Sequence, residues 1–247
     1  MPIARSVLAQ RTSGSSHGLD DSTALGRIVL RALAHALGAN APTSAAERRT
    51  IWRVAGVSPD EVSTTVVTAG LCPTGNTWAD MLRQRTAAGA ETHLDDREIE
   101  RITWHLAPNT VVHVCENPRV VEEAIDVGID KPLVCTLGNP TTVASNLITV
   151  LHAAGARLRY HGDFDWAGVA IAGRMFALGC EPWRMSAQDY EDAVELAEPI
   201  AGDLPPLIGP TVATPWDREL AAAMTAIGRA VHEEALVEVL LGDLTET

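Results

Sequence analysis

The sequence predicts an α/β fold in which a Rossmann-like domain with a parallel sheet follows a small helical or winged-helix-like module. From about residue 107, short β-branched runs alternate with segments of helical periodicity, which is typical of a parallel sheet covered by helices. Before residue 107, apolar residues recur mainly every three or four positions, which indicates helices. We therefore expect a flexible lead-in (1–21), the helical module (22–106) and the α/β domain with a C-terminal helical segment (107–247).

The first half of the chain contains several short predicted elements. A helix with apolar residues on one face, capped by Asp21 or Ser22, is expected to end at Gly38, and a capping box at Ser44–Glu47 starts the next one. On that second helix Arg48, Arg49 and Arg53 are candidate contacts for nucleic-acid phosphates, although a solvated helical face explains them equally well. The remaining predictions are a strand at 64–67 and helices near 76–88 and 95–104.

The second half is predicted as three strand–helix units and a C-terminal helix. The first strand ends at Glu116, the second is followed by a Gly-Asn-Pro turn, and the third leads into the sequence Gly-Asp-Phe-Asp. The strands are expected at 110–115, 132–136 and 157–161, the helices at 118–125, 143–151 and 169–178, and one long amphipathic helix at 216–241.

Composition excludes several classes of protein. The chain has 247 residues and 46% hydrophobic content, which suffices for a core, and none of its apolar runs is long enough to span a bilayer. The first residues do not form a secretory signal. The four cysteines stand far apart without a CxxC pair, which argues against zinc or disulfide frameworks. We expect a cytoplasmic protein that does not bind membranes.

Charge is distributed unevenly along the chain. The net charge of −13 argues against binding DNA by simple electrostatic attraction. Residues 1–60 nevertheless have a local charge of +3, and the remaining residues have −16. Acidic residues are thus concentrated in the half that contains the predicted sheet, where a bound cation would offset part of their charge.

Carboxylates follow two of the three predicted parallel strands. Glu116 ends the first strand, and Asp163 and Asp165 follow the third. Ligands of open parallel sheets bind at the carboxyl ends of the strands, and residues i and i+2 of an extended segment point the same way. Gly162 and Gly168 bracket the aspartates and allow a close approach. Hard oxygen ligands of this kind predict Mg²⁺ or Mn²⁺.

The order of these motifs resembles a known family. The segments VCENP, CTLGNP and HGDFDWAG resemble the Toprim domain of the archaeal type VI topoisomerase A subunit. They are more similar still to JetD-like nuclease subunits of Wadjet plasmid-defence systems, in the branch known as DUF2399. The segments SAAERRTIWRVAGVSPDEVSTTV and TPWDRELAAAMTAIGRAVHEEALVEVLLGDL are also similar to that branch, so the resemblance runs from residue 22 to the end. Members of the branch carry a further N-terminal region, which implies a shortened or split chain.

The resemblance implies both a site and a function. It makes Glu116, Asp163 and Asp165 the Toprim acids, and it implies that Glu234, one of an acidic pair with Glu233, completes the site; an exposed helical face explains the pair equally well. The implied activity is cleavage of double-stranded plasmid DNA. The implied partners are an SMC-like ATPase, its kleisin and an accessory subunit, and a homodimer is left open.

Tyrosine content bears on the chemistry. Type VI topoisomerases attack DNA with a tyrosine that precedes the Toprim fold, whereas this chain has only Tyr160 and Tyr190, both after Glu116. We therefore expect hydrolysis by metal-bound water. His161 is close enough in sequence to the acids to support them, although a structural role is the simpler interpretation. Two other hypotheses remain: a non-catalytic subunit that clamps DNA, and a small-molecule phosphotransferase.

Overall fold

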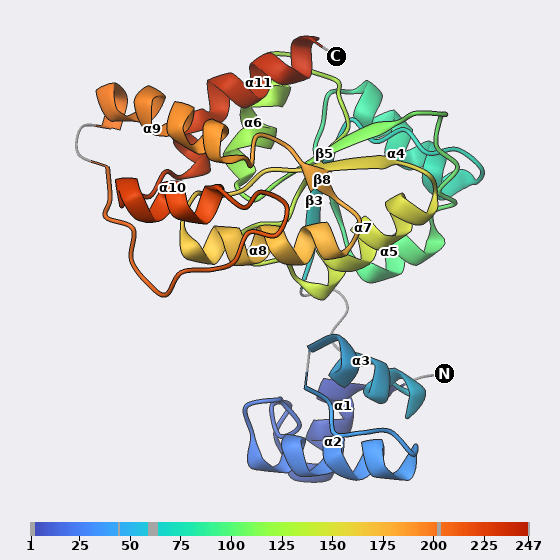
Figure 1. Cartoon of the computed structure of the whole chain (residues 1–247). Coiled ribbons are helices and arrows are strands. Elements are labelled where there is room, and N and C mark those ends of the chain that lie inside the picture. The colour runs from blue at the N-terminus through green and yellow to red at the C-terminus, as the bar shows by residue number, and fades with distance from the viewer. Residues whose placement is uncertain (1–2, 44, 59–63, 202–203, 247) are drawn as a thin grey trace. The chain divides into compact units, whose positions relative to one another are not determined.

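The computed structural model describes residues 3–43, 45–58, 64–201 and 204–246, which form two compact units, Met1–Thr64 and Thr65–Thr247 (Figure 1). We predicted the boundary between the module and the α/β domain at residues 106/107, so the division lies about 40 residues earlier than expected. The reason is strand pairing, because the predicted strand near 64–67 belongs to the sheet of the larger unit. The helices predicted near 76–88 and 95–104 therefore belong to the larger unit as well.

The smaller unit is a helical module with its own core. Trp52 is fully buried and packs with Leu30, Ala34 and Ile51 in a cluster separate from the core of the larger unit. The two short strands pair in parallel, so the described residues do not form the antiparallel wing of a winged helix. The elements are β1 (Ile3–Ala4), α1 (Arg5–Ser13), α2 (Ala24–Ala36), α3 (Ala45–Val54) and β2 (Val57–Ser58).

Two local predictions for this unit need correction. Helix α1 occupies the predicted flexible lead-in and ends at Gly14, whose φ of 74° only glycine adopts readily. Helix α2 is capped by the Thr23 side chain, which accepts a hydrogen bond from Gly26 N, and not by Asp21 or Ser22. The predicted cap Ser44 lies outside the described residues.

The larger unit is built on a six-stranded, mostly parallel sheet. Its strand order is β4-β3-β6-β5-β7-β8, in which β3 is antiparallel to both of its neighbours. The strands β5 to β8 are parallel to one another, and the Val, Leu and Cys side chains of β6 and the centre of β5 are fully buried. The strands are β3 (Val66–Ala69), β4 (Thr92–Leu94), β5 (Val111–Cys115), β6 (Leu133–Cys135), β7 (Arg157–Tyr160) and β8 (Glu181–Pro182).

Helices cover both faces of this sheet. Figure 1 shows α6, α9 and α11 on one face and α5, α7 and α8 on the other, and the contacts of α6 with α11 and of α5 with α7 agree with that arrangement. A mixed α/β fold with helices on both faces confirms the predicted class at this level. The helices are α4 (Thr77–Ala87), α5 (Asp96–Arg101), α6 (Pro118–Asp126), α7 (Thr142–Ala153), α8 (Trp166–Ala177), α9 (Ala187–Ala201), α10 (Leu220–Ile227) and α11 (Val237–Glu246).

The strand order changes direction at β5. From β5 the chain passes through α6 to β6 on one side, and then through α7 to β7 on the other side of β5. Helices α6 and α7 therefore cover opposite faces of the sheet. The loop after β5 and the loop after β7 turn away from each other, which leaves a space between them at the carboxyl ends of these two strands. Such a topological switch point is where open α/β sheets bind their ligands.

The predicted long C-terminal helix at 216–241 is wrong. Helix α10 ends at Gly228, which has φ 68°, and the following residues are extended up to a short 3-10 helix, η1 (Glu233–Leu236). Two β-bridges hold this extended segment, one between Phe164 and Val231 and one between Pro206 and Arg229. The backbone of this segment thus forms hydrogen bonds with distant parts of the chain, in place of the hydrogen bonds of the helix that the local sequence pattern indicated. No described helix has the length and apolar character needed to cross a membrane.

Candidate functional site

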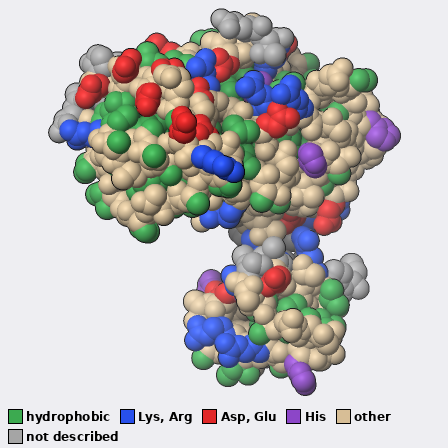
Figure 2. Space-filling model, viewed as in Figure 1, with side chains coloured by type: hydrophobic (Ala, Val, Ile, Leu, Met, Phe, Trp, Pro, Cys, Tyr) green, Lys and Arg blue, Asp and Glu red, His purple; other side chains and the backbone are tan. Residues whose placement is uncertain are grey.

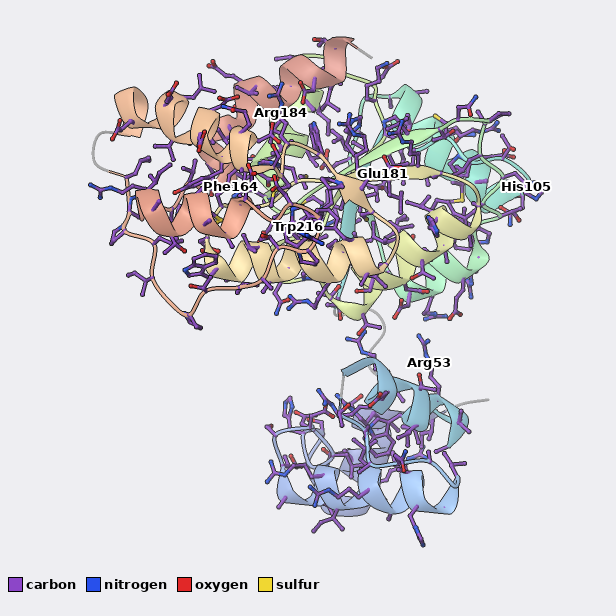
Figure 3. The ribbon with its side chains drawn as sticks, viewed as in Figure 1. Arg53, His105, Phe164, Glu181, Arg184 and Trp216 are labelled. Atoms are coloured by element: carbon purple, nitrogen blue, oxygen red, sulfur yellow. The ribbon has the colours of Figure 1, made fainter. Side chains whose placement is uncertain are left out.

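The loop after β7 places two aspartates at the switch point. Phe164, which is labelled in Figure 3, is fully buried against Tyr190. The side chains of Asp163 and Asp165, on either side of it in the chain, therefore point the other way. Asp165 is the N-cap of α8 and accepts a hydrogen bond of 2.6 Å from Gly168 N. A Cβ at Gly168 would lie 2.2 Å from the carbonyl oxygen of Asp163, so this tight turn requires glycine.

Glu116 follows β5 and reaches the same place. Its Oε2 atom is buried and makes no hydrogen bond within the described part of the chain. A Cβ on Gly162 would lie 3.0 Å from this oxygen and 2.6 Å from the hydroxyl of Tyr160. Gly162 therefore leaves the space that the Glu116 carboxyl group occupies beside the aspartate loop.

The C-terminal segment closes the site from a third direction. Val231 pairs with Phe164, and this contact places Glu233 N 2.8 Å from Oδ1 of Asp163 and Nδ1 of His232 3.2 Å from Oδ2. Both oxygens of the Asp163 carboxylate are thereby held. One ligand atom each from Asp163, Asp165 and His232 lies within 4.8 Å of the others.

Glu233 connects the C-terminal segment to β5. Its side chain is fully buried, and Oε2 accepts hydrogen bonds from Glu116 N at 3.0 Å and from Asn117 N at 2.5 Å. The neighbouring Glu234 is exposed and accepts a hydrogen bond of 2.5 Å from the Asn117 side chain. The acidic pair thus divides into a buried residue that holds backbone groups and an exposed residue at the rim.

The electrostatics of the site show a surplus of negative charge. Burial, followed by the charges of Asp163 and Asp165, raises the pKa of Glu116 to about 7. Burial also raises the pKa of Glu233 well above its usual range. Burial alone would lower the pKa of His232, but its hydrogen bond to Asp163 and the nearby carboxylates outweigh that effect and raise it.

The donor set fits a divalent cation. Asp163, Asp165 and Glu116 offer oxygen ligands of the kind that Mg²⁺ and Mn²⁺ prefer, and the unpartnered buried oxygen of Glu116 is a polar atom that a cation or its water would satisfy. A cation would also relieve the repulsion that raises the Glu116 pKa. His232 adds an imidazole, a ligand type shared by manganese and zinc sites.

The structure brings some of the predicted residues together and separates others. Glu116 lies close enough to Asp163 and Asp165 for their charges to raise its pKa. Among the described residues, the group whose ligand atoms lie within 4.8 Å of one another contains Asp163, Asp165 and His232, and does not include Glu116. Glu234 lies at the rim. His232 and the buried role of Glu233 were missed, because the sequence indicated one helix there. The only sequence signal was the His-Glu-Glu run itself. His161 is fully buried and its Nδ1 lies 2.9 Å from the carbonyl oxygen of Trp183, which fits the structural interpretation.

The three predicted phosphate-binding arginines lie on α3 in the smaller unit. Arg48 forms a salt bridge with Asp21, in which its Nε lies 2.7 Å from Oδ2. Arg49 is half-buried and Arg53 is exposed (Figure 3). Their binding to nucleic acid remains a prediction.

Fold and site together define an α/β protein with a carboxylate-rich centre at the switch point of a mostly parallel sheet. The chain belongs to the family described as "Protein of unknown function C-terminus (DUF2399)", whose model matches residues 92–244, more than half of its length. The model described as "Protein of unknown function N-terminus (DUF3323)" matches residues 1–73. A comparison with curated proteins gives no significant match.

Proposed function

We propose that this chain is a metal-dependent DNA endonuclease whose larger unit is a Toprim domain. The observation that carries the proposal is the convergence of Glu116, Asp163 and Asp165 at the carboxyl ends of β5 and β7, in the chain order of the Toprim acids. Membership of the DUF2399 family supports the finer proposal of a JetD-like cutting subunit in a Wadjet-type plasmid-defence complex. The proposed partners are double-stranded DNA, an SMC-like ATPase, a kleisin and an accessory subunit, in the cytoplasm.

The proposed cofactor is Mg²⁺ or Mn²⁺, held by Asp163 and Asp165 with Glu116 or His232. When bound there, the ion would polarise the scissile phosphate and lower the pKa of the attacking water. The C-terminal segment prepares this site, because the Glu233 backbone and the His232 ring hold the Asp163 carboxylate in one orientation.

Glu116 is suited to accept the proton from the attacking water. Burial and the two aspartates raise its pKa to about 7 in the metal-free protein. A bound cation would lower that pKa and so favour the ionised carboxylate, which is the form that accepts a proton. Its buried Oε2 has no competing hydrogen bond among the described residues. Glu116 would then be a catalytic residue, and Glu233 a positioning residue that holds the Glu116 backbone.

Hydrolysis is favoured over attack by a tyrosine. The side chains of both tyrosines are fully buried, and the Tyr190 hydroxyl donates its hydrogen to the carbonyl oxygen of Arg229. Neither hydroxyl is presented to a substrate, so cleavage should leave free DNA ends without attached protein.

The metal assignment is tested by calorimetric titration with Mg²⁺, Mn²⁺ and Zn²⁺ in separate experiments. We expect Mn²⁺ or Mg²⁺ to bind the wild type and not Asp163→Ala. The matched control is Glu238→Ala, which removes an exposed acid on α11. Equal binding by Asp163→Ala would remove Asp163 from the site, and binding of Zn²⁺ alone would refute the choice of ion.

The activity is tested by incubating supercoiled plasmid with Mn²⁺ and then denaturing the protein. The wild type should cut weakly by itself, because the net charge of −13 leaves few phosphates neutralised, and more strongly with its partners on bent or looped DNA. Undiminished cutting by Glu116→Ala would refute the site, and protein-linked DNA would refute hydrolysis. No cutting with the full set of partners would favour the non-catalytic DNA clamp.

A further inference from the structure

A second polar pocket lies on the larger unit, apart from the acidic site. It has a volume of about 920 Å³ and lies where the chain leaves β8, between β7, the start of α9 and the segment before α10. That volume is in the range of pockets that hold small organic ligands. Its lining combines Arg159, Arg184 and Arg218 with the half-buried ring of Trp216. Figure 3 labels Arg184 and Trp216 on the side of this unit that faces the viewer.

The acids that line the pocket are mostly engaged by other groups. Asp189 accepts hydrogen bonds from the backbone N–H and hydroxyl of Ser186, and Asp217 accepts from Ala187 N and Glu219 N. Asp243 accepts from the Trp183 indole and from two nitrogens of Arg184, Nε and Nη2. Within the described ranges, Glu219 is the one lining carboxylate whose side chain accepts no hydrogen bond.

Two of the three arginines keep their hydrogen-bonding capacity. In the part of the chain that the structure describes, neither Arg159 nor Arg218 makes a hydrogen bond or salt bridge, whereas Arg184 uses two of its donors on Asp243. Arg159 is half-buried and lies close enough to Asp243 to lower its pKa without touching it. The pocket thus contains two guanidinium groups with free donors, and guanidinium donors match phosphate oxygens.

The backbone of the pocket wall is unusual. Arg184 has φ 48°, a conformation that costs energy for a residue with a Cβ, and its two-point salt bridge to Asp243 holds it there. Such outliers occur where the surrounding structure fixes a group for binding. Trp216 is also fixed, by a hydrogen bond of 2.8 Å from its indole to Met185 O and by edge-on packing against Phe176.

We propose that this pocket binds a nucleotide unit, with the phosphate on Arg159 and Arg218 and the base against Trp216. Stacking on an aromatic ring together with arginine contacts to phosphate is how single strands are bound without sequence preference. The nucleotide has two sources, a free mononucleotide or a residue of a DNA strand. Binding of a free mononucleotide would be independent of the proposed nuclease function, whereas binding of a DNA strand rests on that function. Basic and acidic side chains lie side by side on this face (Figure 2), so the affinity should depend on these arginines and not on a general positive surface.

The test is fluorescence polarisation with a labelled oligothymidylate of about ten nucleotides, at low salt and in EDTA. The double variant Arg159→Gln/Arg218→Gln should lose about tenfold or more in affinity, as expected for two lost phosphate contacts. Arg157→Gln is the matched control, because Arg157 lies on the same strand, pairs with Glu181 and does not line the pocket. Arg218→Gln alone serves if the double variant does not fold, because Arg218 is exposed.

Competition with thymidine 5′-monophosphate separates the two sources. Displacement of the labelled strand supports the free nucleotide as a ligand. Arginine-dependent binding without displacement supports the DNA strand. Unchanged binding in the arginine variants, an equal loss in Arg157→Gln, or no binding of either probe by the wild type would overturn the proposal. Because EDTA removes the metal, arginine-dependent binding by a protein that never cuts DNA would refute only the nuclease. If the protein cuts DNA but the arginine variants bind the oligonucleotide as tightly as the wild type, only the pocket proposal would be refuted.

Discussion

Glu233 offers the sharpest test of how the site is held together. The change Glu233→Ala removes the acceptor for two backbone N–H groups, those of Glu116 and Asn117, at the point where the C-terminal segment meets β5. Because the Glu233 side chain is fully buried, water cannot easily replace the lost acceptor. The substitution therefore tests whether this carboxylate stabilises the fold by accepting hydrogen bonds or destabilises it by its charge.

The magnitude follows from the two opposing effects. Each buried N–H left without a partner costs about 1–3 kcal/mol. Relief of the buried negative charge, whose pKa is raised well above its usual range, opposes that loss. We expect Glu233→Ala to lower the free energy of unfolding by about 2–4 kcal/mol. Glu233→Gln should stay within about 1 kcal/mol of the wild type, because a Gln oxygen can take the place of Oε2, which accepts the shorter hydrogen bonds from Glu116 N and Asn117 N. Only the longer bond of 3.3 Å from Glu116 N to Oε1 would be lost.

The assay is urea unfolding followed by far-ultraviolet circular dichroism, in EDTA. A loss of about 3 kcal/mol moves the midpoint by roughly 1 M urea or more. Glu234→Ala is the control, since Glu234 is exposed and should change stability by less than about 1 kcal/mol. An unchanged midpoint for Glu233→Ala would refute the structural role of this residue. Equal losses for the Ala and Gln variants would show that the charge matters, and not the acceptance of hydrogen bonds.

Three further predictions follow from the site and its surroundings. Gly162→Ala should cost about 1–3 kcal/mol of stability, because the new methyl group would lie 2.6 Å from the Tyr160 hydroxyl; wild-type stability by thermal unfolding would contradict this packing. Asp165→Asn should preserve the melting temperature, because Asn also caps helices, whereas Asp165→Ala should lose about 1 kcal/mol; equal melting temperatures would rule out the cap. Burial would raise the pKa of Asp243, but the hydrogen bonds from Arg184 and Trp183 outweigh that effect and lower it. The ionised Asp243 therefore stabilises the folded protein above the pKa that it has in the unfolded chain, and this stabilisation is lost as the pH falls through the pKa of the folded state. Asp243→Asn should therefore be less stable than wild type at neutral pH, and the difference measured by urea unfolding should shrink below about pH 4; a difference independent of pH would refute the ionic contribution.

The sequence by itself was sufficient for the features that depend on near neighbours. The strand–helix alternation predicted β5, β6 and β7 closely, because β-branched runs and helical periodicity are local properties. The convergence of Glu116 with Asp163 and Asp165 also followed from local rules, since parallel strands share a carboxyl edge and residues i and i+2 share a side of the chain.

Only the tertiary structure decided how the rest of the site is completed. The apolar periodicity of 216–241 indicated a continuous helix, but the pairing of Val231 with Phe164 holds the chain extended after Gly228. That pairing joins residues 67 positions apart in the sequence, so no local pattern reports it. It decides that Glu233 is buried, that Glu234 is exposed and that His232 reaches Asp163. The boundary at residues 64/65 has the same origin, because β3 joins the larger sheet by hydrogen bonds to β6, a strand more than 60 residues away.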